Sequence, residues 1–276
     1  MGKFDGVLIC TDLDGTLLKN DKTVSPENRE AIAYFMAEGG YFTFITGRMP
    51  YFVKDILARV SINAPFGCVN GAGIYDPVVG KYVWTQPIRD DVIELVRYVD
   101  ANTEDMGIQI NCFEHLYFSR ENKTMEIFRQ RTGLPNLVRD YADIDEPIAK
   151  IVFGDHREER LLRVKELLDA HPRRDDFDYI RSERSLYEIL PKGVSKGTLL
   201  ARMAEHLQIP MAHTVAVGDY YNDVSMLQAA GIGVAVENAT PEAKAAADHI
   251  TVSNENHAMA QIITDLDAGT IRLPPL

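Results

Sequence analysis

Val7-Leu8-Ile9-Cys10-Thr11-Asp12-Leu13-Asp14-Gly15-Thr16 is the stretch that decides the fold. Its first half is a continuous apolar run, which is typical of a strand buried on both faces of a parallel sheet. The run stops at Asp12, and a second carboxylate and a glycine follow directly. Because ligands bind at the carboxyl ends of parallel strands, this junction is a candidate site.

The residues after this junction continue with alternating helices and strands. Ser25-Pro26-Glu27 has the form of an N-cap followed by a proline in the first helical turn, and Gly39-Gly40 ends that helix. A second strand over 41–45, a helix over 51–60 and a third strand over Phe66–Val69 follow. The order βαβαβ predicts a parallel sheet with right-handed crossovers.

The pattern changes after Asn70-Gly71 and returns near residue 190. A hairpin is predicted over 75–83, with glycine and proline in its turn. Further on, helices near 90–101, 121–131 and 157–170 alternate with strands near 107–119, 148–153 and 177–190. The βα alternation resumes with a helix from Ser195, strands over 214–217 and 232–236, a helix around 223–230 and a last helix after Pro241. We therefore predict a doubly wound α/β core of residues 1–83 and 190–276, interrupted by an inserted α+β cap domain of residues 84–189.

Composition narrows the class of protein. The chain has 276 residues, 46% of them hydrophobic and 25% charged, which excludes a disordered or fibrous protein. Its net charge of −12 disfavours nucleic acid and anionic membranes as partners. No stretch approaches the roughly 20 apolar residues of a membrane span, so a cytoplasmic protein, monomeric or in a small homo-oligomer, is expected. The widely spaced Cys10, Cys68 and Cys112 fit buried thiols better than disulfides or a zinc site.

Polar residues follow three of the predicted core strands. They lie in Asp12–Thr16, in Thr46-Gly47-Arg48 and in Gly218–Asp223. Any one of these aspartates alone is as readily explained as a helix cap or a turn residue. Gathered at one edge of a sheet, however, their carboxylates repel one another, and a hard divalent cation such as Mg²⁺ relieves that repulsion. The sequence therefore predicts a metal site.

A carboxylate beside Mg²⁺ is also a nucleophile toward phosphorus. Asp12, at the end of a rigid strand, is placed for in-line attack, and Asp14 is placed to protonate the leaving oxygen and then to activate water. The loop around Leu13 offers backbone N–H groups to a phosphoryl group, and Thr46 offers a hydroxyl. Lys196, at the start of a predicted helix, supplies a cation, although a lysine in a first helical turn is most often a solvated surface residue.

These segments together resemble the four motifs of the haloacid dehalogenase superfamily. In chain order the motifs are Asp12-Leu13-Asp14-Gly15-Thr16-Leu17-Leu18, Thr46-Gly47-Arg48, Lys196, and Gly218-Asp219-Tyr220-Tyr221-Asn222-Asp223. The long gap between Thr46 and Lys196 is similar to that of the Cof-type branch, the class IIB phosphatases, which carry a large cap between the second and third motifs. The resemblance covers the whole chain.

The resemblance implies a role for each matching residue. Asp12 would be the nucleophile, Asp14 the acid and base, and the metal ligands would be the carboxylates of Asp12 and Asp219 with the backbone carbonyl of Asp14. The phosphate would be held by Leu13, Thr46, Gly47, Lys196 and Asn222. Asp223 would not bind the metal directly but would orient the metal-bound waters or Lys196 by hydrogen bonding. The implied activity is Mg²⁺-dependent hydrolysis of a small phosphorylated metabolite, a sugar phosphate, through an aspartyl-phosphate.

The cap is expected to close over the crevice and to set specificity. His115, Arg120 and Lys123 are its candidate substrate contacts, against the plainer interpretation of a solvated surface. Three alternatives to a phosphatase stay open. A phosphomutase would return the phosphoryl group to the sugar, a dehalogenase would have no need of Asp14, and a regulatory module would bind metal or phosphate without turnover.

Overall fold

The computed structural model describes residues 2–274, which divide into two compact units. One unit is formed by the chain up to Trp84 together with the chain from Ser195 onward, and the other by Thr85–Val194. We call them the core unit and the cap unit. From the sequence we expected the two boundaries to lie between residues 83 and 84 and between residues 189 and 190.

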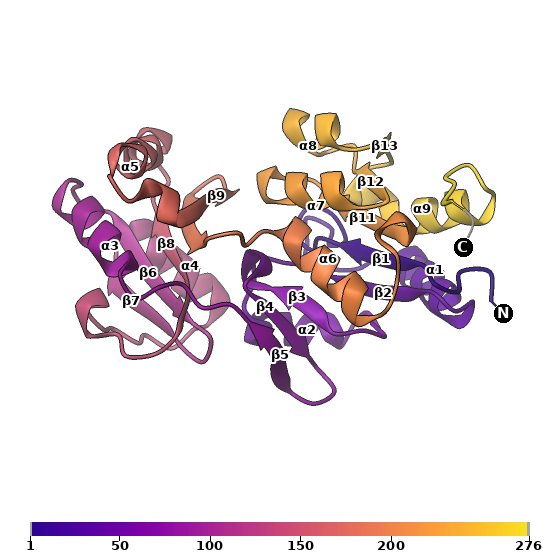
Figure 1. Ribbon diagram of the computed structural model, residues 1–276, viewed down its shortest axis with the longest axis horizontal. Helices are drawn as coiled ribbons and strands as arrows, with labels where there is room; N and C mark the ends of the chain where they lie inside the picture. The colour runs from indigo at the N-terminus through magenta and orange to yellow at the C-terminus, as the bar shows by residue number, and fades with distance from the viewer. Residues whose placement is uncertain (1, 275–276) are drawn as a thin grey trace. The chain divides into compact units, whose positions relative to one another are not determined.

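The core unit is built on a five-stranded parallel sheet (Figure 1). Its strand order is β13-β12-β11-β1-β2, and every neighbouring pair is parallel. The strands are β1 (Leu8–Thr11), β2 (Tyr41–Phe44), β11 (Thr214–Gly218), β12 (Ile232–Ala235) and β13 (His249–Ile250). All residues of β1, β11 and β12 are buried, as expected for strands covered on both faces. The predicted α/β fold with a parallel sheet is therefore confirmed.

The crossovers of this sheet define where a ligand binds. From β1 through α1 (Pro26–Ala37) the chain moves to β2, and from β11 through α7 (Val224–Ala229) it moves in the opposite direction to β12. Right-handed crossovers in opposite directions place α1 and α7 on opposite faces. α1 packs against α9 (Ala258–Asp267), and α7 packs against α6 (Lys196–His206). The strand order thus reverses between β1 and β11, and in open α/β sheets ligands bind at the carboxyl ends of the strands beside such a reversal.

The third strand of the expected βαβαβ unit departs from the prediction. β3 (Phe66–Cys68) belongs to a three-stranded sheet with β4 (Gly73–Asp76) and β5 (Lys81–Thr85), the predicted hairpin. Its backbone pairs with the end of β2 at one parallel bridge between Ile45 and Gly67, beside which the Phe44 and Phe66 rings are in contact. The cause is a turn directly after Cys68, which folds the chain back into β4 before a longer parallel strand forms.

Other elements are shorter or more numerous than expected. The helix expected over 51–60 is a 3-10 turn, Pro50–Val53, followed by the short α2 (Lys54–Leu57). After Pro241 the chain forms α8 (Pro241–Ala246), and then β13 and α9, which the sequence analysis did not separate. β13 is a two-residue edge strand with both residues exposed, so it has no apolar pattern to reveal it.

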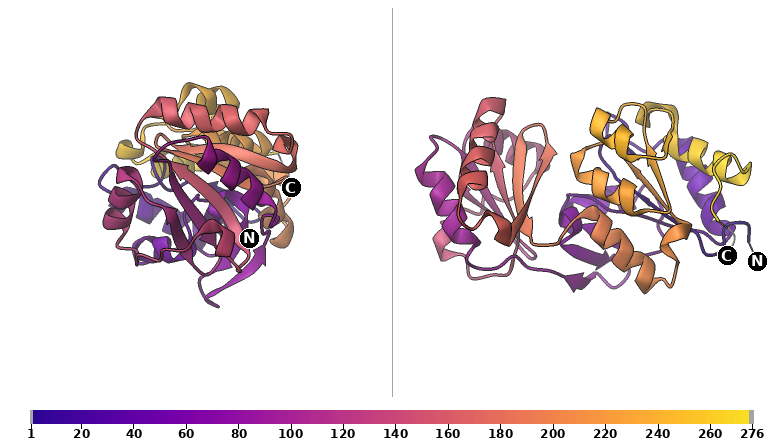
Figure 2. Two further views of the ribbon diagram at one scale, coloured as in Figure 1. Left: turned by 90° about the vertical axis from the view of Figure 1, so that its left-hand side faces the viewer. Right: turned by 45° about the horizontal axis from the view of Figure 1, so that its top comes forward.

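The cap unit is an antiparallel sheet with two of its three α-helices, α3 (Val92–Ala101) and α5 (Glu158–Ala170), packed on one face (Figure 2, right). Its strand order is β7-β6-β8-β10-β9. The strands are β6 (Gly107–Cys112), β7 (Leu116–Arg120), β8 (Ile148–Gly154), β9 (Phe177–Glu183) and β10 (Leu186–Pro191), and the third helix is α4 (Lys123–Thr132). Apolar residues of α3 and α5 form one buried cluster with alternate residues of the sheet. This is the expected α+β arrangement.

Each candidate cap contact already has an acidic partner within the cap unit. His115 pairs with Glu146 (2.9 Å), Arg120 with Asp100 (3.1 Å) and Asp140 (3.1 Å), and Lys123 with Glu126 (2.9 Å). The His115, Arg120 and Lys123 side chains are 40% to 67% exposed, so these contacts contribute little to stability. Cys10, Cys68 and Cys112 are buried, as the sequence indicated. Within residues 2–274, none of the helices has the length and apolarity that a membrane crossing requires.

Candidate active site

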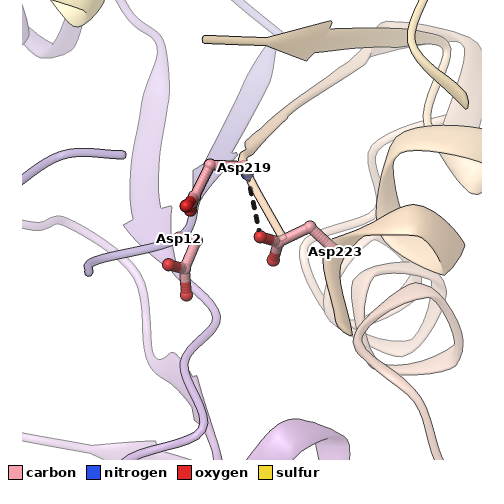
Figure 3. Close-up of side chains that lie close together, drawn as sticks. All are labelled: Asp12, Asp219 and Asp223. Atoms are coloured by element: carbon pink, nitrogen blue, oxygen red, sulfur yellow. Dashed lines mark hydrogen bonds between the residues drawn. The ribbon is translucent and has the colours of Figure 1, made fainter. Parts of the chain in front are cut away.

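Three carboxylates meet where the strand order reverses (Figure 3). Asp12 directly follows β1, and its backbone N–H donates to the carbonyl of Val217 in β11 (2.8 Å). Asp219 directly follows β11, and Asp223 precedes α7. One oxygen from each carboxylate lies within 4.8 Å of the others. The carboxyl ends of two paired strands therefore bring together residues more than 200 positions apart.

A buried lysine lies between two of these carboxylates. Lys196 begins α6, whose N-cap Ser195 accepts a hydrogen bond from the Thr198 N–H. Its side chain is fully buried, and its Nζ lies 2.5 Å from Asp12 Oδ1 and 2.6 Å from Asp223 Oδ1. Burial alone lowers a lysine pKa, but the two carboxylates outweigh it and raise the pKa of Lys196 above its usual value. The side chain is therefore a charged ammonium and not the solvated surface residue that its helix position suggested.

The carboxylates carry more negative charge than this ammonium neutralises. Burial, with repulsion from Asp223 and Asp219, raises the pKa of Asp12 well above its usual value in spite of Lys196. Burial and the charge of Asp223 raise the pKa of Asp219 to about 7. Since both shifts disfavour the charged carboxylates, the site favours the arrival of another cation.

The free oxygens show which residues suit a metal ion. Both oxygens of Asp223 are used, Oδ1 by Lys196 and Oδ2 by the N–H groups of Asp219 and Tyr220. Oδ1 of Asp12 accepts a hydrogen bond from Lys196, and Oδ1 of Asp219 accepts one from the Thr16 hydroxyl at 2.7 Å. In residues 2–274 nothing donates to Oδ2 of either. Two carboxylate oxygens without donors fit a hard cation such as Mg²⁺, and Asp223 fits the supporting position.

Asp14 is directed toward a different part of the site. Its carboxylate forms a two-point ion pair with Arg48, with both N···O distances 2.7 Å, and a third bond with Lys22 at 2.8 Å. Burial raises the pKa of this carboxyl, but Arg48 and then Lys22 outweigh burial and lower it to about 2. Asp14 is therefore ionised here. Gly15 then turns the loop at φ +82°, where a Cβ would lie 2.5 Å from Asp219 Oδ2.

The residues expected to hold phosphate lie on two further segments. Thr46 follows β2, is 2% exposed and accepts a hydrogen bond from the Arg48 N–H (3.2 Å). Asn222 precedes α7, and its Nδ2 donates to Oδ1 of Asn70 (3.0 Å). Leu13 is fully buried, which anchors the loop after β1. Asn70 was not among the residues expected from the sequence; the Asn-Gly pair at the end of β3 was the available signal.

Comparison with known proteins agrees with this geometry. The model of the haloacid dehalogenase-like hydrolase family matches residues 9–263. The chain belongs to this family, as the motifs predicted, and it is a phosphatase of the Cof type.

Curated relatives and solved structures match over nearly the whole chain. Phosphatase YwpJ of Bacillus subtilis is 29% identical over 94% of this chain and 99% of its own. The 5-amino-6-(5-phospho-D-ribitylamino)uracil phosphatase YitU of the same organism is 26% identical over 94% and 96%. The crystal structure of a haloacid dehalogenase-like hydrolase from Bacteroides thetaiotaomicron superposes with a TM-score of 0.79 at 25% identity, covering 94% of this chain and 98% of that one.

Proposed function

We propose that this phosphatase is a Mg²⁺-dependent phosphoric monoester hydrolase that acts on a small sugar phosphate through an aspartyl-phosphate on Asp12. The observation that carries the proposal is the buried group in which Lys196 joins Asp12 to Asp223, beside Asp219. The relative YitU supports the substrate class, since its name places the phosphate on a ribityl chain.

Each step is assigned to a residue of this chain. An oxygen of Asp12 attacks phosphorus, and the bond from phosphorus to the alcohol oxygen breaks as Asp14 gives that oxygen a proton. For this step Asp14 leaves its ion pairs with Arg48 and Lys22, which keep it ionised, and first binds a proton from solvent. The ionised Asp14 next takes a proton from water, whose oxygen attacks phosphorus and releases phosphate from Asp12. Lys196, Thr46, Asn222 and the backbone N–H groups of Leu13 and Gly47 hold the phosphoryl oxygens.

The metal site is assigned to the carboxylates of Asp12 and Asp219 and the backbone carbonyl of Asp14. When bound there, Mg²⁺ offsets the negative charge of the carboxylates and of the phosphoryl oxygens. Asp223 does not coordinate in this scheme, because its oxygens hold Lys196 and the Asp219 N–H.

We assign substrate selection to the cap unit, Thr85–Val194. The test is a panel of sugar phosphates, nucleotides and an aryl phosphate, assayed for phosphate release with Mg²⁺ and with a chelator. Metal-dependent release, fastest from a sugar phosphate, supports the proposal. Isomerised sugar without free phosphate indicates a mutase, and a lasting phosphoprotein without release indicates a regulatory module.

Replacing Asp14 is expected to stall the cycle after the first step. In Asp14→Asn the amide takes no proton from water, so hydrolysis of the aspartyl-phosphate slows by about 10²-fold or more. With an aryl phosphate, whose leaving group departs without a proton, we expect one equivalent of product in a burst and a phosphoprotein detected by intact mass. Wild-type protein should show no lasting phosphoprotein. Multiple turnovers at the wild-type rate would contradict the role of Asp14.

Replacing Asp219 is expected to weaken metal binding. MgCl₂ should raise the thermal unfolding midpoint of the wild-type protein, since a ligand bound only by the folded state stabilises it. Asp219→Asn removes one of the two carboxylates that bind the metal directly. For the same rise in the unfolding midpoint, this variant should require an MgCl₂ concentration about tenfold higher than wild type. Glu255→Gln, which changes a surface carboxylate of the same unit paired with Lys19 (3.5 Å), is the control. If the unfolding midpoint rose with MgCl₂ in the same way in all three proteins, Asp219 would not be a metal ligand.

A further inference from the structure

The segment after β3 has an unusual backbone. Its φ angles are +55° at Val69, +53° at Asn70 and +112° at Gly71. Glycine and asparagine adopt this region readily, but for a β-branched residue such as Val69 it is a strained conformation. All three residues are buried. Strain of this kind persists where surrounding contacts fix the backbone, and it is concentrated at functional sites.

The contacts that fix this segment come from the proposed phosphate site. The N–H groups of Val69 and Asn70 donate to the carbonyls of Arg48 and Thr46, each at 3.1 Å. On the other side, a Cβ at Gly71 would lie 2.4 Å from the carbonyl oxygen of Ser195, the residue before Lys196. The segment therefore lies between the loop after β2 and the start of α6.

The Asn70 side chain is the part that reaches the phosphate-binding groups. It is 1% exposed, and its Oδ1 accepts a hydrogen bond from Nδ2 of Asn222 at 3.0 Å. A Cβ at Gly47 would lie 2.9 Å from the same Oδ1, so the amide packs against the Gly47 backbone. The hydrogen bond occupies one of the two hydrogens on the Asn222 amide nitrogen and fixes the plane of that amide.

We infer that Asn70 is a positioning residue of the phosphate site, which holds the Asn222 amide in the orientation that binds a phosphoryl oxygen. This inference rests on the proposed function, because that proposal gives Asn222 its phosphate. Asn70 acts through the Asn222 amide to which it is hydrogen-bonded. Without the Asn70 side chain, the Asn222 amide is free to rotate, and phosphate binding then includes the entropic cost of ordering it.

The test is a double-mutant cycle of Asn70→Gly and Asn222→Ala. Glycine keeps the positive φ, so it removes the side chain without a new backbone strain. The dissociation constant of inorganic phosphate, measured by calorimetry with saturating MgCl₂, should rise about tenfold in each single variant. In the double variant it should rise no further than in Asn222→Ala, because coupled residues are not additive. KM for an aryl phosphate should follow the same pattern.

A matched control separates backbone effects from the side-chain effect. Gln208 also has a positive φ, +57°, but it is exposed and lies after the far end of α6. Gln208→Gly should leave phosphate binding within about twofold of wild type. If Asn70→Gly does not fold, as judged by circular dichroism, Asn70→Ser with its shorter side chain takes its place in the cycle.

The outcomes distinguish this inference from the proposed function. A phosphate affinity unchanged by Asn70→Gly, or effects that multiply in the double variant, overturns the positioning role even where wild-type turnover is normal. Conversely, coupled loss of phosphate binding in a protein that hydrolyses none of the phosphate esters supports the positioning role and overturns the proposed phosphomonoesterase.

Discussion

Asp12→Asn is expected to abolish phosphate release, with kcat/KM falling by at least about 10³-fold. The carboxylate oxygen that attacks phosphorus becomes an amide oxygen, which is a far poorer nucleophile. The fold should persist, because an amide oxygen at the same place still accepts a hydrogen bond from Lys196, now 2.5 Å from Asp12 Oδ1. The substitution also removes a buried carboxyl group, and the raised pKa of that group shows that burial disfavours its charged form.

The measurement is phosphate release beside the thermal unfolding midpoint of the same preparation. Mass spectrometry should confirm that the introduced asparagine has not deamidated, since a trace of restored aspartate would mimic residual activity. Asp267→Asn is the matched control, because Asp267 forms an exposed ion pair with Lys3 (2.7 Å) in the same unit. Its activity should stay within about twofold of wild type. Turnover by verified Asp12→Asn at more than about 1% of the wild-type rate would rule out the covalent mechanism.

Four of the five strands of the core sheet were predictable because they are short, continuous apolar runs that are followed by charged or polar residues. Leu8–Thr11 and Thr214–Gly218 both end at an aspartate, and that pattern needs no tertiary information. The sheet that β3 joins was not predictable in the same way. Its partner was decided by the positive φ angles after Cys68, which depend on contacts with Arg48, Thr46 and Ser195 and leave only an Asn-Gly pair in the sequence.

The site was partly predictable for the same physical reason. Asp12 and Asp219 follow adjacent parallel strands, so the strand-end rule alone places them together. The environment of each side chain was beyond the sequence: composition gives no sign that Lys196 is fully buried or that Asp14 lies against Arg48 and Lys22. Such features depend on which side chains meet across long stretches of chain.

Lys196→Met is expected to abolish turnover and also to destabilise the core unit by about 3–5 kcal/mol, the usual effect of removing one partner of a buried ion pair. Methionine has a similar length but no charge, so Asp12 and Asp223 are left buried without their cation. Chemical denaturation measures the free energy of unfolding. Lys3→Met, which changes an exposed lysine of the same unit, should leave the unfolding midpoint unchanged.

The double variant Lys196→Met with Asp223→Asn separates the two roles of this lysine. An amide at position 223 keeps an oxygen for the N–H groups of Asp219 and Tyr220 but removes one of the two uncompensated charges. Stability should therefore recover in part, since the destabilisation comes from unpaired buried charge. Phosphate release should not recover, because no cation replaces the ammonium that holds the phosphoryl oxygens. If activity returned together with stability, Lys196 would be a structural residue and the phosphate site would need another cation.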